Sequence, residues 1–232
     1  MMGEIIVLEI EYAFGDNVGT IYPVVLVDNE DMVLVDCGYS GFLPLIEEAF
    51  ERKGLNIKKL TKVVVTHHDY DHMGALNTLK QKYPNIEIIA SYTEAPFIRG
   101  DKKALRLEQA ERIQETLSDE QKAFGQAFCE MLRGVEACPV DIQVNGGDEF
   151  NWCGGCQIID SKGHTAGHIS LYLKEHKIIV TGDAGVLEKE KLVVANPQYA
   201  FDLKAAENSL RELLSYDAST YICYHGGIYR KN

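Results

Sequence analysis

Hydrophobic residues in alternating or β-branched runs, separated by short polar turns, predict strands in both halves of this 232-residue chain. Predicted strands cover residues 5–12, 19–27, 32–36, 62–66 and 86–90 in the first half, and residues 148–152, 157–160, 169–173, 177–181 and 220–224 in the second. Hydrophobic positions three or four residues apart predict amphipathic helices over residues 43–53, 72–82 and 203–215. The first three strands are expected to form an antiparallel meander, with Gly15-Asp16-Asn17 as its first turn.

Residues 92–137 interrupt this pattern. Helical periodicity with charges of both signs predicts two long helices there, over residues 102–117 and 119–132. The strand patterns on either side do not obviously need these helices to form a core. We therefore expect a helical insertion within a single domain that spans residues 1–232.

Five potential metal ligands lie within six consecutive residues directly after the predicted strand 62–66, namely His67, His68, Asp69, Asp71 and His72. Loops at the C-terminal ends of buried strands commonly carry functional side chains, because these side chains converge there without disturbing the core. Imidazole and carboxylate groups together suit zinc, iron or manganese. The segment therefore predicts a metal site.

The string His67-His68-Asp69-Tyr70-Asp71-His72 resembles the first metal motif of the metallo-β-lactamase superfamily, H-x-H-x-D-H, with Asp69 where a second histidine is commonest. Three later segments resemble the remaining motifs of this family in the expected order: Gly163-His164-Thr165-Ala166-Gly167-His168, Thr181-Gly182-Asp183 and Tyr224-His225-Gly226-Gly227. The resemblance covers nearly the whole chain. It implies an α+β fold, a four-layer αββα sandwich in which two sheets pack face to face with helices outside.

The resemblance also implies a binuclear metal site. By it, His67, Asp69 and His164 bind one divalent metal ion, Asp71, His72 and His225 bind another, and Asp183 bridges the two. Zinc is expected first because the superfamily most often uses it, with manganese or iron as alternatives that the extra carboxylate of Asp69 favours. Of the other histidines, His168 is expected to support His164 from behind, His68 to point away from the ligands, and His176 to lie in a solvated turn.

Metal-assisted hydrolysis is the chemistry that the resemblance implies: a metal-bridging hydroxide attacks an ester, lactone, thioester or similar bond of a small molecule. Asp71 or a nearby tyrosine would then protonate the leaving group. Tyr199, between Asp183 and the last predicted helix, is a candidate for oxyanion or substrate contact, and simple packing in its loop is the alternative. An iron-dependent oxidoreductase or oxygenase on the same scaffold is the competing class, since oxygenation needs only one metal. A metal-binding protein without turnover would predict lost ligands, and none of the seven positions is lost.

Insertions in this superfamily often lie over the metal cleft, so residues 92–137 resemble a lid that faces the substrate. A helical pair that packs in a homodimer is the alternative. Among known branches, secreted β-lactamases are disfavoured by the lack of an export signal. Glyoxalase II enzymes are disfavoured by Asp69 and by the lack of a glutathione-binding extension after His225. Acyl-homoserine lactonases stay open, although they normally keep histidine where Asp69 stands, and the pattern is similar to bacterial cytoplasmic hydrolases with H-x-D-x-D-H.

The composition of the chain disfavours two classes of binding partner, nucleic acids and membranes. The net charge of -12 disfavours nucleic acid, whose phosphates an acidic surface repels. No apolar run approaches the roughly 18 residues of a membrane span, and the N-terminus lacks a basic segment followed by an apolar one, so a cytoplasmic protein without membrane contact is expected. The six cysteines are then expected to stay thiols. Cys153-Gly154-Gly155-Cys156 predicts a hairpin turn rather than a redox motif, because a strand and not a helix follows.

Overall fold

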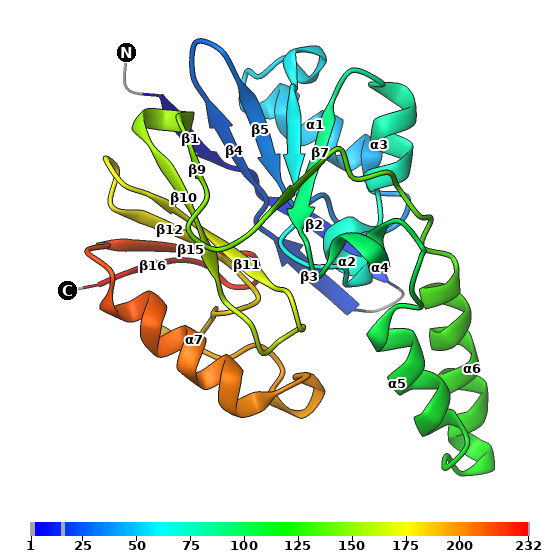
Figure 1. Cartoon of the computed structure of the whole chain (residues 1–232). Helices are drawn as coiled ribbons and strands as arrows, with labels where there is room; N and C mark the ends of the chain where they lie inside the picture. The colour runs from blue at the N-terminus through cyan, green and yellow to red at the C-terminus, as the bar shows by residue number, and fades with distance from the viewer. Residues whose placement is uncertain (1–2, 15–16, 232) are drawn as a thin grey trace.

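Two six-stranded sheets form the body of the protein (Figure 1). The computed structural model describes residues 3–14 and 17–231. The first sheet has the order β1-β4-β5-β6-β7-β8, formed by Glu4–Val7, Val24–Val27, Met32–Val35, Lys62–Val64, Glu87–Ser91 and Ile142–Val144. Its β1, β4 and β5 pair antiparallel, whereas β5 to β8 run parallel.

The second sheet comes from the second half of the chain. Its order is β16-β15-β12-β11-β10-β9, formed by Gly227–Arg230, Thr220–Cys223, Ile178–Gly182, Ile169–Leu173, Cys156–Asp160 and Glu149–Phe150. All pairs are antiparallel except β12 with β15. Two short ribbons accompany the sheets, β2 with β3 (Ile10–Phe14, Asn17–Ile21) and β13 with β14 (Val186–Glu188, Lys191–Val193).

Alternating side chains on the strands divide the core into three layers. On β6 and the residue after it, Val63 and Val65 belong to the cluster beneath α1 (Leu43–Arg52) and α3 (Leu76–Lys82), whereas Val64 faces the second sheet. On β10, Ile158 faces the first sheet and Ile159 packs in the cluster beneath α7 (Leu203–Ser215). Strands buried on both faces are nearly continuous in hydrophobic residues for this reason. The predicted α+β, four-layer αββα sandwich is confirmed.

The N-terminal strands differ from the prediction. Residues 5–12 and 19–27 each divide into two strands, so β1 pairs with β4 and β2 pairs with β3 in a separate ribbon. The break within residues 19–27 falls at Pro23, which has no N–H to donate to a neighbouring strand. The simple meander is therefore wrong, and the predicted turn Gly15-Asp16-Asn17 lies mostly outside the described residues.

The hairpin predicted at Cys153-Gly154-Gly155-Cys156 is present, because β9 and β10 pair antiparallel on either side of it. Its residues 152–154 form the 3-10 helix η2. Both cysteines are buried thiols. A second 3-10 helix, η1 (Ile57–Lys59), precedes β6, and a third, η3 (Pro197–Tyr199), precedes α7.

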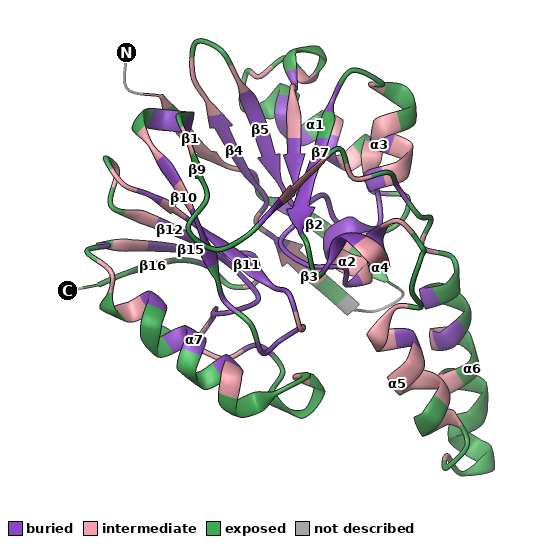
Figure 2. Cartoon of the chain, in the orientation of Figure 1, coloured by how far each residue is buried: buried purple, intermediate pink, exposed green. Residues whose placement is uncertain are grey.

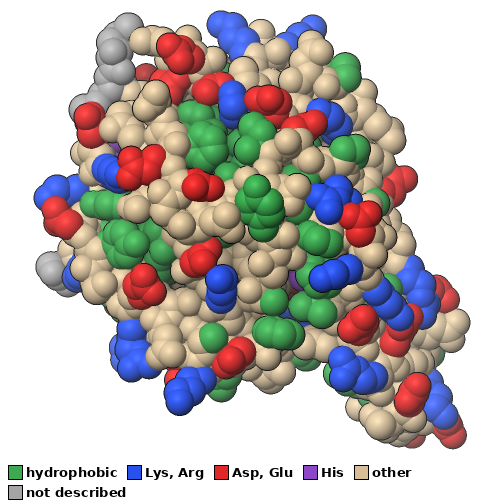
Figure 3. Space-filling view, viewed as in Figure 1, with side chains coloured by type: hydrophobic (Ala, Val, Ile, Leu, Met, Phe, Trp, Pro, Cys, Tyr) green, Lys and Arg blue, Asp and Glu red, His purple; other side chains and the backbone are tan. Residues whose placement is uncertain are grey.

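Along the chain, the predicted insertion falls between β7 and β8, two neighbouring strands of the first sheet, and not between the segments that form the two sheets. The chain leaves β7, forms α4 (Ala95–Ile98), α5 (Leu105–Gln114) and α6 (Asp119–Arg133), and returns as β8 beside β7. The helices α5 and α6 pack on each other and project from the body, with few buried residues (Figure 2). The projecting part carries acidic and basic side chains together (Figure 3). The short strand β8 was not predicted. Without it, the insertion was predicted to separate the first half of the chain from the second.

A helix was predicted over residues 72–82, but the structure breaks it into α2 (Tyr70–Met73) and α3. Gly74 ends α2 where the chain passes very close to another loop. A Cβ atom on Gly74 would lie 2.3 Å from Ser40 N and 2.5 Å from Tyr39 C and Tyr70 O. Only glycine permits this approach of backbone to backbone. Within the described part of the chain, no helix combines the length and apolar character needed to cross a membrane.

Gly74→Ala is expected to destabilise the fold by about 3 kcal/mol, because its methyl group meets backbone atoms that cannot move independently. Urea unfolding followed by circular dichroism measures the loss. Gly134→Ala is the matched control, since Gly134 has a helical φ of -75° and should stay within about 0.5 kcal/mol of the original protein. Equal stability of the two variants would show that the contact at Gly74 is not tight.

Candidate metal centre

The predicted ligands lie at one edge of the sandwich, where several strands end. β6 leads into His67, β12 ends directly before Asp183, and β15 leads through one residue into His225. His164 lies in the loop between β10 and β11. The remaining ligands follow His67 in the turn that enters α2 and on α2 itself. Residues far apart in the sequence therefore meet because the strands that carry them end at the same edge.

All of the predicted ligands come together in the folded chain. Their ligand atoms form three overlapping groups, each within 4.8 Å: His67, Asp69 and His164; His67, His72 and Asp183; and Asp71, His72 and His225. The first and third groups are the two triads that the family resemblance assigns to separate metal ions. The side chains of Asp71 and His225 are 13% and 29% exposed, and those of the other five at most 6%. The cluster thus opens to solvent on the side of Asp71 and His225.

Asp183 lies between the two triads. Its Oδ2 is 3.5 Å from His164 Nε2, whereas its Oδ1 is 3.4 Å from His72 Nε2 and 3.7 Å from His225 Nε2. Each carboxylate oxygen therefore faces a different triad. This is the orientation that a bridging carboxylate needs, and the bridging role stays a prediction.

Buried atoms without partners favour metal ions at this position. Nε2 of His67 and His72 and Oδ1 of Asp183 are buried and make no hydrogen bond to any residue in the ranges 3–14 and 17–231. A buried polar group without a partner is costly in a folded protein. A cation among these atoms would satisfy all three, and imidazole with carboxylate donors suits zinc, manganese or iron. The residues present therefore fit divalent metal ions.

Negative charge dominates the cluster. Burial by itself would lower the pKa of His72, His164 and His225, but Asp183 raises the pKa of His72 and His225, and Asp69 raises that of His164. Burial would likewise raise the pKa of Asp69 and Asp183, but the adjacent imidazoles hold both well below the usual range. The carboxylates are therefore ionised at neutral pH, and their potential attracts cations.

Asp36 and Thr66 orient two of the ligand histidines from outside the cluster. His72 Nδ1 is 2.9 Å from Asp36 Oδ2, and His67 Nδ1 is 3.0 Å from Thr66 Oγ1. The Thr66 amide and hydroxyl both donate to Asp36 at 2.8 Å. Because Nδ1 of each ring is engaged, Nε2 is directed into the cluster. Asp36 lies at the end of the predicted strand 32–36. This position was its signal in the sequence, but no role in the site was predicted for it.

His168 lies behind the cluster, as predicted, but it supports different residues. Its Nδ1 is 2.8 Å from Ser161 Oγ, and its Nε2 accepts a 2.9 Å hydrogen bond from the backbone N–H of Asp183. Its ring packs 4.9 Å from that of His67 and 6.3 Å from that of His164. Burial, with the neighbouring His67, holds the pKa of His168 well below 6.5, so its ring is neutral and can accept this bond. His168 therefore positions Asp183 and His67 more directly than His164.

His68 belongs to none of the three ligand groups and instead joins the metal loop to the insertion. Its Nδ1 pairs with the Glu94 carboxylate, and its Nε2 accepts the Leu105 N–H at 3.2 Å. Its ring stacks on Phe97 with centroids 4.4 Å apart. The first turn of α5 is therefore fixed by a residue that directly follows a predicted ligand.

Glu94 is a buried carboxylate that the sequence analysis missed. Besides pairing with His68, it accepts hydrogen bonds from the Thr165 hydroxyl at 2.8 Å and the Gly167 N–H at 2.7 Å. These bonds tie the loop that carries His164 to the loop that carries His67. Glu94 lies in a segment predicted as insertion, where one more acidic residue gave no signal of a buried role.

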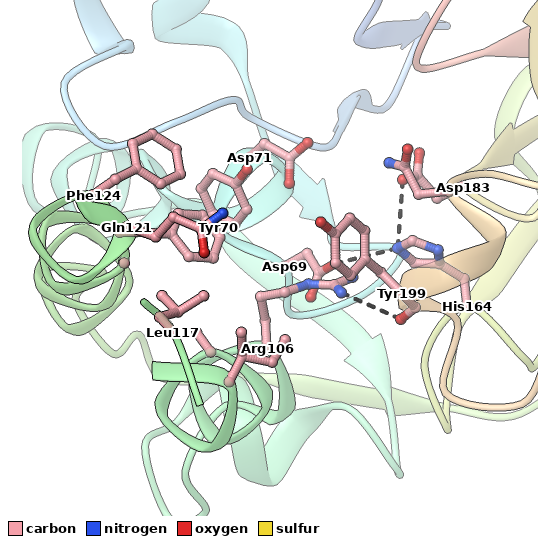
Figure 4. Close-up of a pocket in the computed structure, with 15 residues that line it drawn as sticks. Asp69, Tyr70, Asp71, Arg106, Leu117, Gln121, Phe124, His164, Asp183 and Tyr199 are labelled. Carbon is pink, nitrogen blue, oxygen red and sulfur yellow. Dashed lines mark hydrogen bonds and ion pairs between the residues drawn. The ribbon is translucent and has the colours of Figure 1, made fainter. Parts of the chain in front are cut away.

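Arg106 is the second residue that the sequence analysis missed. From α5 its Nη2 donates to Asp69 Oδ2 at 2.9 Å, and its Nη1 donates to Tyr199 O at 3.2 Å and Gln109 Oε1 at 3.1 Å. Figure 4 shows the guanidinium between Asp69 and Tyr199. Only 12% of the Arg106 side chain is exposed. The insertion thus brings a positive charge to the carboxylate that stands where the family usually has histidine.

Tyr199 lies beside the cluster on η3 and is 47% exposed. The Arg106 guanidinium lies 5.2 Å from the centroid of its ring. Tyr199 therefore packs in its loop and also borders the cavity above the cluster, so its role in catalysis stays a prediction. His176, the remaining histidine, is half-buried in the turn between β11 and β12 and is not among the clustered ligands.

Comparison with known proteins identifies the family to which this fold and site belong. A sandwich of two sheets with an aspartate- and histidine-rich site at its strand ends defines a class of metal-dependent enzymes. The sequence profile of the Metallo-beta-lactamase superfamily matches residues 16–225, and the chain belongs to this superfamily. The match also confirms the predicted enzyme class, a metal-dependent hydrolase.

Individual relatives share less than a third of their aligned residues with this chain. The chain is 27% identical over 208 residues to the probable metallo-hydrolase YflN of Bacillus subtilis (strain 168), covering 84% of this chain and 75% of that protein. It is 28% identical over 189 residues to hydroxyacylglutathione hydrolase of Brucella ovis, covering 81% of this chain but only 54% of the relative. A solved metallo-beta-lactamase family protein from Thermus thermophilus superposes with a TM-score of 0.75 at 20% identity, over 97% of this chain and 74% of the other. The last likeness supports the fold alone.

Arg106→Gln is expected to destabilise the metal-stripped protein by about 2 kcal/mol, because it leaves the buried Asp69 carboxylate with less compensating charge. Bound divalent cations would supply that charge, so the loss should be smaller in metal-loaded protein. Urea unfolding with chelator and with added zinc or manganese measures both values.

Arg133→Gln provides the control, since Arg133 pairs with Glu111 at the surface and its loss should have little effect in either condition. An equal loss for Arg106→Gln with and without metal would contradict the charge-compensating role of Arg106.

Proposed function

We propose that this protein hydrolyses an ester, thioester or lactone bond of a small molecule at a binuclear metal centre held by His67, Asp69, Asp71, His72, His164, Asp183 and His225. The observation that supports this best is the orientation of Asp183, whose two oxygens face different triads. Zinc is the metal expected first, with manganese or iron as alternatives. A cytoplasmic location belongs to the same proposal.

Two bound divalent cations would polarise the carbonyl oxygen and lower the pKa of water at the site. The residues of the chain provide the rest. Asp183 and the ligand histidines hold fixed positions because Asp36, Thr66 and His168 orient them. Asp71 lies at the solvent side of the cluster, 3.2 Å from His225, where its carboxylate could take a proton from the attacking water and pass it to the leaving group. Tyr199 at the rim of the cavity is a candidate for substrate contact.

The relatives support a hydrolase and not a particular substrate. One is named a probable metallo-hydrolase, and the other is named for hydroxyacylglutathione, although this chain spans only about half of the second protein. An iron-dependent oxidoreductase or oxygenase on the same scaffold is the alternative. The three clustered carboxylates are compatible with iron, so metal content is the measurement that separates the two functions.

Elemental analysis of protein purified without added metal or chelator, combined with a panel of small esters, thioesters and lactones, tests the proposal. About two zinc or manganese ions per chain together with cleavage of one substrate class is the expected result. Iron in the protein with oxygen consumption and no hydrolysis would favour the alternative. A protein that binds no metal tightly would overturn both.

Asp183→Asn is expected to reduce metal content below that of the original protein and to lower kcat/KM by at least about 100-fold, because one bridging oxygen becomes an amide nitrogen that cannot bind a cation. The fold should persist, so circular dichroism should be unchanged. Asp217→Asn, an exposed aspartate on the surface, is the matched control and should retain metal and activity. Full metal content in Asp183→Asn would exclude the bridge.

A further inference from the structure

The cavity above the metal cluster extends along the insertion. It has a volume of about 470 Å³, within the range of roughly 300–1,000 Å³ typical of small-molecule sites. One end is polar and is lined by Asp69, Asp71, Arg106, His164 and Asp183. The other end is lined by α5, α6 and the turn between them. Figure 4 shows the two ends facing each other, with Phe124, Gln121 and Leu117 opposite Asp183 and His164.

The end formed by the insertion is apolar. Its lining consists of Ala110, Ile113, Leu117, Phe124, Gly125 and Phe128, with Gln121 as the polar residue among them. Phe124 is 79% exposed and Ile113 is 48% exposed. Large apolar side chains that border a cavity while remaining open to water mark a binding surface for an apolar group.

Tyr70 connects the two ends of the cavity. It lies in the metal loop between Asp69 and Asp71, and its ring packs edge-on against Phe128 of α6, with centroids 5.9 Å apart. The apolar wall therefore begins directly beside the predicted ligands. A substrate group that extends from the metal centre therefore meets apolar side chains at once.

The charges in the cavity are concentrated at the metal end. Arg106 is the cation among its described lining residues, and its guanidinium already donates to Asp69, Tyr199 and Gln109. Charged groups are absent from the described lining contributed by residues 110–128. A charged substituent would therefore lose its hydration there without gaining an ion pair.

We propose that the substrate carries an apolar acyl chain that lies along α5 and α6 while its carbonyl group lies at the metal end. This inference rests on the proposed hydrolase function and adds the substrate class. The reaction adds water across the acyl bond: a new C–O bond forms, the C–O or C–S bond breaks, and the proton of water goes to the departing alcohol or thiol. Arg106 and Ile113 lie about two helical turns apart, which is about 11 Å, so a chain of about eight carbons would span the wall.

A series of acyl thioesters and 4-nitrophenyl esters from two to ten carbons tests the chain preference. The expected result is a kcat/KM at least about tenfold higher for eight carbons than for two, since burial of each methylene is favourable. Phe124→Ser should reduce this ratio several-fold. Met131→Gln is the matched control, because Met131 is also exposed on α6 but does not line the cavity, and it should keep the ratio.

Binding without turnover separates this inference from the proposed function. Calorimetric titration of the protein as purified with octanamide and butanamide, which are poor substrates for ester cleavage, should give binding at least about tenfold tighter for octanamide, and Phe124→Ser should abolish the difference. An active enzyme with no chain preference in either assay would overturn the acyl site and leave the hydrolase intact. A protein that prefers octanamide but cleaves no ester, thioester or lactone would instead overturn the hydrolase.

Sedimentation tests the other occupant of the apolar wall, a second copy of the chain. A dimer that Phe124→Ser converts to monomers would show that this surface is an interface, and it would overturn the acyl site.

Discussion

Three buried carboxylates held together among histidines are the constraint on which the rest of this structure depends. Asp69, Asp71 and Asp183 lie so close that their ionised forms would repel each other without positive charge between them. The chain supplies part of that charge through imidazoles and through Arg106. Several buried nitrogen and oxygen atoms of the described residues lack hydrogen-bond partners, and this favours cations at the same site.

The sandwich holds the carboxylates and histidines close together because it fixes the positions at which the strands that carry them end. Its core is divided into layers by the alternation of side chains, and each strand near the site is buried on both faces. Displacement of one strand along another would disrupt close packing on both of its faces, so the positions of the strand ends are well determined. The positions of the ligands that follow β6, β12 and β15 are therefore well determined too. Hydrogen bonds that Asp36 and His168 accept from His72 and Asp183 fix them further.

Hydrophobic alternation is a local pattern and was sufficient to predict most strands and helices. The four-layer sandwich and the seven residues that converge were predicted from the resemblance of the spaced motifs to a known family. The missing parts depend on contacts between distant segments. The break at Gly74 follows from the approach of the loop at Ser40, which no local pattern encodes. Glu94 and Arg106 resembled ordinary surface residues of a charged helical segment, and only the fold shows that they contact the metal loop. The division of the N-terminal strands had a signal in Pro23 that was overlooked.

The attachment of the insertion has a consequence for how this protein can change over evolution. Its near end is tied to the metal loop by His68 and Arg106, whereas its far end touches little of the body. Substitutions at the far end can therefore accumulate with little effect on the stability of the sandwich or on the ligands. The helical pair is in this sense a replaceable module, and descendants of this chain could acquire new substrates by altering it while inheriting the metal centre unchanged.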